Sequence, residues 1–196
     1  MSIVTHAYAR AGLVGNPSDG YHGKTIAFVI RQFKATVTLT ESDRFEILPD
    51  ETDFANYDSV AAFMRDVKLH GYYGGMRLMK AIVKKFYDYA ARHHANLPLD
   101  RNFQLKFETH IPRLVGMSGS SAIMCATLRA LMKFYNVDIP LPIMPGVILS
   151  AEKEELHISA GLQDRVIQSY EGMVYMDFCK ELVQKQGYGE YIPLKP

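Results

Sequence analysis

The chain has 196 residues, of which 48% are hydrophobic, and its 22 basic residues nearly cancel its 21 acidic residues. This length and composition predict a soluble globular protein of one domain, with room for part of a second. A net charge near zero supplies no field that would draw the chain onto nucleic acid or an anionic membrane, so we expect neither partner.

Targeting and membrane signals are not indicated. Residues 1–10 (MSIVTHAYAR) lack a charged start followed by an apolar core. No apolar run approaches the roughly 18 residues of a spanning helix. Cys125 and Cys179 lack the spacing of a zinc site or a disulfide framework. We therefore expect a cytoplasmic protein with two reduced thiols.

Short strand patterns dominate the first fifty residues. Residues 3–9 predict a strand, and residues 9–25 (ARAGLVGNPSDGYHGKT) predict a turn-rich loop that holds four glycines. Residues 26–30, 35–39 and 45–48 are short apolar or β-branched runs with polar residues between them, which indicates an antiparallel meander.

Helical spacing follows this meander. A first helix is expected after Ser59 and a second from about Gly75, and residues 91–100 (ARHHANLPLD) predict a loop that includes His93 and His94.

The second half mixes one strand pattern with several helical ones. Residues 103–108 alternate apolar and polar side chains and predict a half-buried strand. A long helix should follow, then one around residues 142–156, a short one from Gly161 and a strand over 170–178. The order predicts an α+β fold in which helices cover one side of a mostly antiparallel sheet.

A run of small residues, SGSSA (118–122), precedes the long predicted helix. A helix N-terminus presents unpaired N–H groups and partial positive charge, so small residues there can admit a phosphate. Gly116 and Gly119 permit a tight backbone path, and the hydroxyls of Ser120 and Ser121 can cap the helix or bind a magnesium ion. The alternative is a flexible connection with an ordinary serine cap. No Gly-Lys-Ser/Thr follows, so this is not a Walker loop.

Two carboxylates stand twelve residues apart, Glu152 on one predicted helix and Asp164 near the start of the next. A turn at Gly161 can bring them to one point, and phosphoryl transfer needs one carboxylate beside a metal ion and another beside the acceptor hydroxyl. The alternatives are a solvated helix face for Glu152 and a first-turn acid, paired with Arg165, for Asp164.

Three blocks of the sequence resemble one family. They are RAGLVGNPSDGYHG (10–23), PRLVGMSGSSA (112–122) and the spacing of Glu152 to Asp164. Together they resemble the GHMP small-molecule kinases, most closely the plant-type glucuronokinases. Asn16-Pro17 stands where galactokinases have a glutamate-histidine pair, which argues against galactose.

The resemblance implies a role for each matched residue. Asp164 would be the base that takes the proton of a sugar hydroxyl, with Arg10 as its cationic neighbour, and Ser121 and Glu152 would be Mg²⁺ ligands. The residues implied to hold the ATP phosphates are Gly116, Ser118, Gly119, Ser120 and Ser121. The residues implied to bind the sugar are Asp19, Asn16, Tyr21, His22 and Lys24. His22 and Lys24 are equally compatible with plain surface positions.

The same resemblance implies a domain organisation. Residues 1–170 would form the ATP- and sugar-binding N-terminal domain, and residues 171–196 a strand and tail leading into a second domain that this chain lacks. We therefore expect a homodimer or a second polypeptide to cover exposed apolar surface.

The expected activity is ATP-dependent phosphorylation of the anomeric hydroxyl of a uronic acid such as D-glucuronate. The alternatives are a non-catalytic nucleotide- or sugar-binding module and a kinase for another sugar or a small alcohol. Arg113 and Arg165 can each pair with a uronate carboxylate or be surface charges.

Overall fold

The computed structural model describes residues 1–49, 59, 64–65, 74–93, 97–98 and 101–195. Most of the helix expected after Ser59 lies outside these residues, as does His94. Among the described residues, no helix is both long and apolar enough to cross a membrane.

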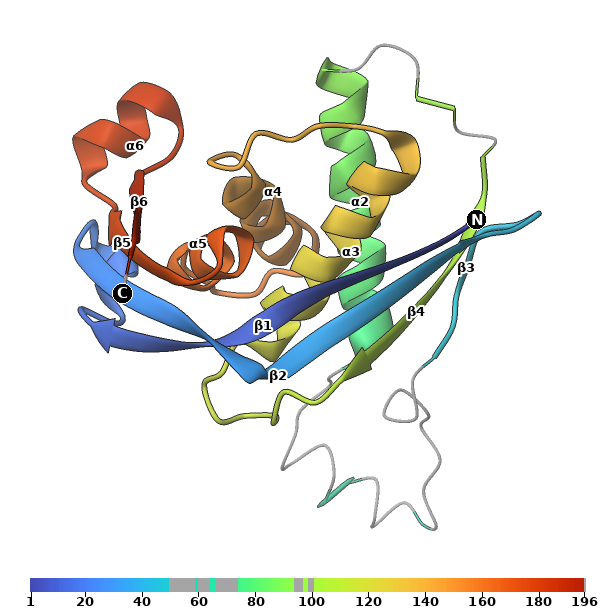
Figure 1. The fold of residues 1–196 in the computed structure, drawn as a ribbon, viewed down its shortest axis with the longest axis horizontal. Helices are drawn as coiled ribbons and strands as arrows, with labels where there is room; N and C mark the ends of the chain where they lie inside the picture. The colour runs from blue at the N-terminus through green and yellow to red at the C-terminus, as the bar shows by residue number, and fades with distance from the viewer. Residues whose placement is uncertain (50–58, 60–63, 66–73, 94–96, 99–100, 196) are drawn as a thin grey trace.

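A six-stranded sheet forms one layer of the molecule (Figure 1). Its strands are β1 (Ser2–Val14), β2 (Lys24–Glu41), β3 (Glu46–Ile47), β4 (Phe103–Thr109), β5 (Met173–Asp177) and β6 (Glu190–Leu194). The order is β3-β4-β2-β5-β6, with β1 paired to β2. Every pair is antiparallel except β3 with β4. The prediction of a mostly antiparallel sheet is confirmed.

One long strand, β2, replaces two of the predicted ones. It runs through the polar stretch at residues 31–34, where its register with β1 shifts between Tyr8 and Ala9. Arg31 and Gln32 are exposed there, so polar side chains bend the strand without ending it. The prediction of separate strands over 26–30 and 35–39 was wrong because a bulge has the same sequence pattern as a turn.

The predicted glycine-rich loop is also shorter than expected, because β1 continues to Val14. A single 3₁₀ turn, η1 (Ser18–Tyr21), then connects it to β2. Gly15 makes this reversal possible: its φ is +82°, and a Cβ there would collide with the carbonyl oxygen of Lys24.

The helices form the second layer, on one side of the sheet (Figure 1). They are α2 (Gly75–His93), α3 (Gly119–Tyr135), α4 (Met144–Ser150), the π-helical turn η3 (Ala151–Glu155) and α5 (Gln163–Tyr170), with α6 (Lys180–Gln186) lying beside β6. This layering confirms the predicted α+β class. His93, predicted to be in a loop, is the last residue of α2, and its ring packs on Tyr89 at 4.4 Å between centroids.

The core lies between α3 and the sheet. Twelve residues of α3 are buried, as expected for a helix covered on all sides. Alanines at matching positions let the two layers approach closely: Ala7 and Ala9 of β1 and Ala126 of α3 are fully buried. This close packing sets the N-terminus of α3 next to the end of β1 that carries Arg10.

Residues 171–195 pair with the same sheet. The predicted strand over 170–178 is β5, which bonds to β2, and β6 bonds to β5. Val174 and Met176 of β5 join Ala27, Val166 and Ile167 in a second apolar cluster. The boundary at residue 170 stays a prediction.

Candidate active site

The loop between β4 and α3 has a left-handed backbone at three residues. Leu114, Gly116 and Ser118 have φ angles of 59°, 73° and 62°. Non-glycine residues adopt this conformation at a cost, so the surrounding structure must hold it. Turns with left-handed residues form backbone concavities that bind anions. The SGSS segment is therefore part of a tight loop of defined conformation and not a flexible connection.

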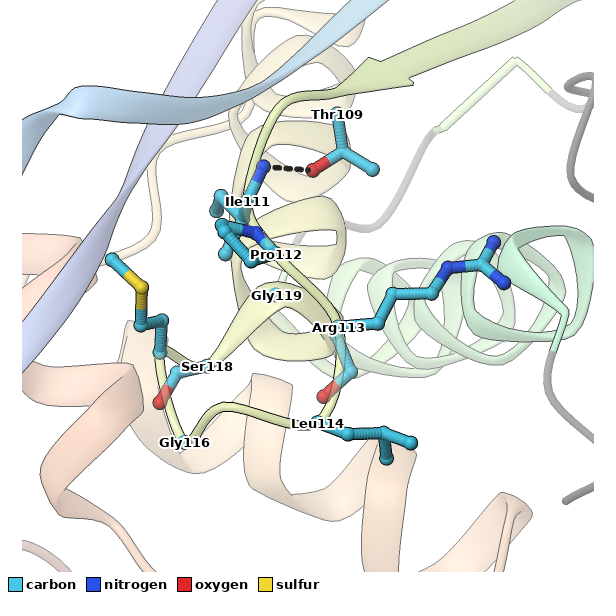
Figure 2. A pocket seen from close by; sticks show the side chains of 10 residues that line it. Thr109, Ile111, Pro112, Arg113, Leu114, Gly116, Ser118 and Gly119 are labelled. Atoms are coloured by element: carbon cyan, nitrogen blue, oxygen red, sulfur yellow. Dashed lines mark hydrogen bonds between the residues drawn. The ribbon is translucent and has the colours of Figure 1, made fainter. Parts of the chain in front are cut away.

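A pocket of about 200 Å³ opens against this loop and the first residues of α3 (Figure 2). Its lining residues are Thr109, Ile111, Pro112, Arg113, Leu114, Gly116, Met117, Ser118, Gly119 and Ser120. The Ser118 hydroxyl oxygen is buried, and no described residue bonds to it. A buried hydroxyl without a partner is costly, so Ser118 has a donor to offer to a ligand. In Figure 2, Arg113 extends away from Gly116 and Ser118.

Gln168 of α5 fixes the conformation of this loop. Its Nε2 donates to the carbonyl oxygens of Ser118, at 2.8 Å, and Tyr8, at 3.2 Å. The side chain is fully buried. One amide therefore ties the phosphate-loop candidate to β1 and to the helix that carries Asp164.

Arg10 and Asp164 form an ion pair beside the loop. Arg10 Nε donates to Asp164 Oδ1 at 2.5 Å, and Arg10 Nη1 donates to the Gly116 carbonyl oxygen at 3.1 Å. Both side chains are mostly buried, with 14% and 19% exposed. The structure thus brings together the predicted base, its predicted cationic neighbour and the predicted phosphate loop.

Glu152 lies on the π-helical turn η3 and is almost completely buried, with 1% exposed. Arg165 donates to its Oε2 from Nε at 2.5 Å and also from Nη2. Its Oε1 faces the Ser120 hydroxyl at 3.4 Å. Burial raises the pKa of the Glu152 carboxyl, against the opposing effect of Arg165. The solvated helix face considered for Glu152 is therefore wrong.

The two serines at the start of α3 point to different partners. Ser121 is fully buried, and its hydroxyl donates to the Ser118 carbonyl oxygen at 3.2 Å. Ser120 is the one whose hydroxyl faces Glu152. The predicted metal role of Ser121 stays a prediction, while the geometry favours Ser120.

The predicted sugar-binding loop meets the N-terminus of α5. Asp19 Oδ2 accepts a hydrogen bond from the Gln163 backbone N–H at 3.0 Å, and Asn16 Oδ1 accepts one from Gln163 Nε2 at 3.2 Å. A Cβ on Gly161 would collide with Asp19 Oδ2. Asp19 and Asn16 are therefore both bonded to Gln163, the residue directly before Asp164 in α5. The sugar role needs such a position near the base.

The other three candidates of that loop lie at its rim. Tyr21 is 83% exposed, and His22 is exposed with a left-handed backbone. Lys24 Nζ pairs with Asp177 Oδ2 of β5 at 2.9 Å. Asp19 and Asn16 thus bond to the residue beside Asp164, whereas the other three candidates show no such contact among the described residues. The sugar roles of all five stay predictions.

Two oxygen donors of the site suit a magnesium ion. Mg²⁺ is commonly held by one or two carboxylates together with substrate phosphates. Glu152 Oε1 and the Ser120 hydroxyl present two oxygens side by side, next to the pocket at the phosphate loop. Among the described residues, no three His, Cys, Asp or Glu side chains gather into a metal cluster. The residues fit a metal ion that also depends on bound phosphates.

Two glutamines of the site were not assigned to it from the sequence, and Arg165 was given a different role. Gln163 and Gln168 look like ordinary polar positions of a short helix, and nothing in their spacing marks them. Arg165 was considered a surface charge or a uronate partner, but it is 5% exposed and paired with Glu152. Its position directly after Asp164 is the one signal that could have found it.

Residues 78–172 match the model of the GHMP kinases N terminal domain. This stretch of the chain belongs to the GHMP kinases N terminal domain family. Two Arabidopsis thaliana proteins are similar over almost all of it. Glucuronokinase 1 is 45% identical over an alignment of 196 positions, which covers 98% of this chain and 54% of that protein. Probable glucuronokinase 2 is 48% identical over an alignment of 189 positions, which covers 94% of this chain and 51% of that protein.

A solved structure supports the fold. The Methanococcus jannaschii mevalonate kinase superposes with a TM-score of 0.72 and 16% identity, covering 100% of this chain and 56% of that one. The chain thus spans about half the length of the plant relatives that it matches.

Proposed function

We propose that this chain provides the active site of an ATP-dependent kinase that phosphorylates the anomeric hydroxyl of a uronic acid such as D-glucuronate. The observation that carries the proposal is the Arg10–Asp164 pair, whose arginine also reaches the Gly116 carbonyl of the phosphate loop. Base, cation and phosphate loop are then adjacent, and phosphoryl transfer depends mainly on such positioning.

Asp164 would accept the proton of the sugar hydroxyl. Its Oδ1 is engaged by Arg10 at 2.5 Å, whereas its Oδ2 has only a longer contact of 3.3 Å with Arg165 Nη1. Oδ2 is therefore the oxygen more readily available to a substrate hydroxyl. Arg10 would hold the carboxylate in this orientation and oppose the negative charge of the transferred phosphoryl group.

The ATP phosphates would bind at the loop and the start of α3, where the Ser118 hydroxyl lacks a partner among the described residues. Glu152 Oε1 and the Ser120 hydroxyl would hold Mg²⁺. The chemistry supplied there would be positive charge that offsets the negative charge of the ATP phosphates. We assign Ser120 here in preference to Ser121, because the Ser121 hydroxyl is engaged by Ser118.

The acceptor class is proposed from the plant relatives, which are 45% and 48% identical and named glucuronokinases. Asp19 and Asn16 would bind sugar hydroxyls next to Asp164, since both are hydrogen-bonded to Gln163. This arrangement supports a polyhydroxylated acceptor over a simple alcohol.

A second polypeptide segment or a second copy would complete the site. Leu114 and Val115 of the phosphate loop are 75% and 59% exposed, although one of them lines the pocket. Apolar side chains at the rim of a ligand pocket favour a covering partner. Until it is covered, the chain would bind nucleotide and transfer phosphate slowly, and light scattering of the isolated chain tests the association.

A coupled ADP-release assay over a panel of sugars, with and without a longer polypeptide, tests the function. We expect D-glucuronate to be the best acceptor and Asp164→Asn to abolish transfer while nucleotide binding persists. Equal loss of transfer and nucleotide binding would contradict the base assignment. Nucleotide binding without product under every condition would favour a non-catalytic binding module.

A further inference from the structure

Arg165 contacts both carboxylates of the proposed site. Its Nε and Nη2 donate to Glu152 Oε2, and its Nη1 lies 3.3 Å from Asp164 Oδ2. The same Nη1 donates to the Gly161 carbonyl oxygen at 2.9 Å. One planar guanidinium thus binds a residue of η3, the first turn of α5 and the turn before it.

This pairing is buried, so it cannot be an incidental surface contact. The Arg165 side chain is 6% exposed and the Glu152 side chain 1%. Two buried charges stabilise each other only with good geometry and further hydrogen bonds, and both conditions hold here. Lysine could not reproduce this arrangement, because its ammonium is a single point charge and not a fork.

The bonds leave one oxygen of each carboxylate for ligands. Arg165 takes Oε2 of Glu152, so Oε1 is directed to Ser120. At Asp164 the strong bond is made by Arg10 to Oδ1, and Arg165 only aligns Oδ2. The guanidinium therefore sets the orientation of both groups without blocking either one.

We propose that Arg165 is a positioning residue that aligns the metal-binding carboxylate of Glu152 with the base Asp164. The inference rests on the proposed function, since it assigns a positioning role to a residue of the same site. Without Arg165, Glu152 Oε2 would lose both guanidinium hydrogen bonds, and these bonds are what leave Oε1 directed to Ser120.

The test uses the full chain with Mn²⁺ and ADP as the probes. Arg165→Met should weaken Mn²⁺ binding to the ADP complex about 10- to 100-fold, the usual effect of removing a group that orients a metal ligand. ADP binding in EDTA should be unchanged. Lys153→Met is the matched control: it removes a cation next to Glu152 in sequence, but Lys153 is exposed, and it should bind Mn²⁺ normally.

Arg165→Lys separates charge from geometry and keeps the test valid if Arg165→Met does not fold. Lysine should restore most of the Mn²⁺ affinity, because its ammonium can still donate a hydrogen bond to Glu152 Oε2. It should still lower kcat for the sugar at unchanged KM for ATP, because it cannot align Asp164. Normal Mn²⁺ binding by Arg165→Met, or full recovery of kcat by Arg165→Lys, would overturn the proposal.

Glu152→Gln distinguishes failure of the positioning role of Arg165 from failure of the metal role of Glu152. If Glu152→Gln abolishes Mn²⁺ binding while the Arg165 variants bind it normally, the positioning role fails and the proposed function stands. If Glu152→Gln binds Mn²⁺ as the wild type does, the metal assignment fails and the role of Arg165 fails with it.

Discussion

Arg10 Nε lies 2.5 Å from Asp164 Oδ1, although the two residues are separated by more than 150 positions in the sequence. The contact joins the last part of β1 to the first turn of α5. It exists because β1 continues past the predicted strand end and lies under α3 and α5. The same arginine also donates to the Gly116 carbonyl oxygen, so the pair connects both elements to the phosphate loop.

Removing the cation of this pair should impair phosphoryl transfer more than nucleotide binding. We expect Arg10→Met to lower kcat about 100-fold, the range seen when one electrostatic donor is removed from an active site. ADP binding in EDTA should persist, because the loop is also fixed by Gln168. Arg31→Met is the control: Arg31 is 62% exposed and pairs with Glu171. Steady-state kinetics and calorimetry measure both effects, and a kcat unaffected by Arg10→Met would contradict the assignment.

The fold could be predicted from the sequence as far as local patterns reach. Alternating apolar residues predicted β4, which buries one face. Helical spacing of apolar residues predicted α2, which buries one face, and α3, which is buried along most of its length. The continuity of β2 could not be predicted, because exposed Arg31 and Gln32 resemble a turn and only pairing with β1 keeps them in a strand.

In the candidate site, too, local sequence patterns predicted some residues, while others depend on packing. Short motifs identified Asp164, Glu152 and the phosphate loop, because their residue types and spacing are distinctive. Gln168 and the contact of Arg165 with Glu152 were missed, since both depend on how α5 packs. The choice between Ser120 and Ser121 also needed the structure, because neighbouring residues of a helix point in different directions.

The two serines predict a clear difference between variants. Ser120→Ala should weaken Mn²⁺ binding to the ADP complex, because the hydroxyl facing Glu152 is lost. Ser121→Ala should instead lower the free energy of unfolding by about 1 kcal/mol, the net value of one hydrogen bond. Mn²⁺ titration and urea unfolding separate the effects. The reverse result would restore the metal role to Ser121.

Gly161 should not tolerate a side chain. Its Cβ would collide with Asp19 Oδ2, so Gly161→Ala must displace the carboxylate that we assign to the sugar. We expect a higher KM for the sugar at unchanged KM for ATP, and a destabilisation of about 1–3 kcal/mol from overpacking. Gly146→Ala is the matched control, because a Cβ there meets no atom within 4 Å and alanine favours the helix α4. An unchanged sugar KM for Gly161→Ala would argue against a role for Asp19.

Burial of Glu152 should make stability depend on pH. Its pKa is raised by burial, from an ordinary value of 4.5, so the folded state holds this proton more tightly than the unfolded state. The resulting stabilisation is present below pH 4.5 and is lost as pH rises through the folded-state pKa. Relative to Glu152→Gln, the wild type should therefore lose free energy of unfolding as pH increases above 4.5. Urea unfolding between pH 4.5 and 7 measures this difference.

Glu155 provides a control of opposite sign for this pH experiment. Hydrogen bonds from Lys84 and Lys85 lower its pKa, so its stabilisation is present above its ordinary value of 4.5 and is lost as pH falls. Glu155→Gln should thus cost stability at pH 7 and little at low pH, the reverse of Glu152→Gln. Parallel pH profiles for both variants would show that burial does not control the protonation of Glu152.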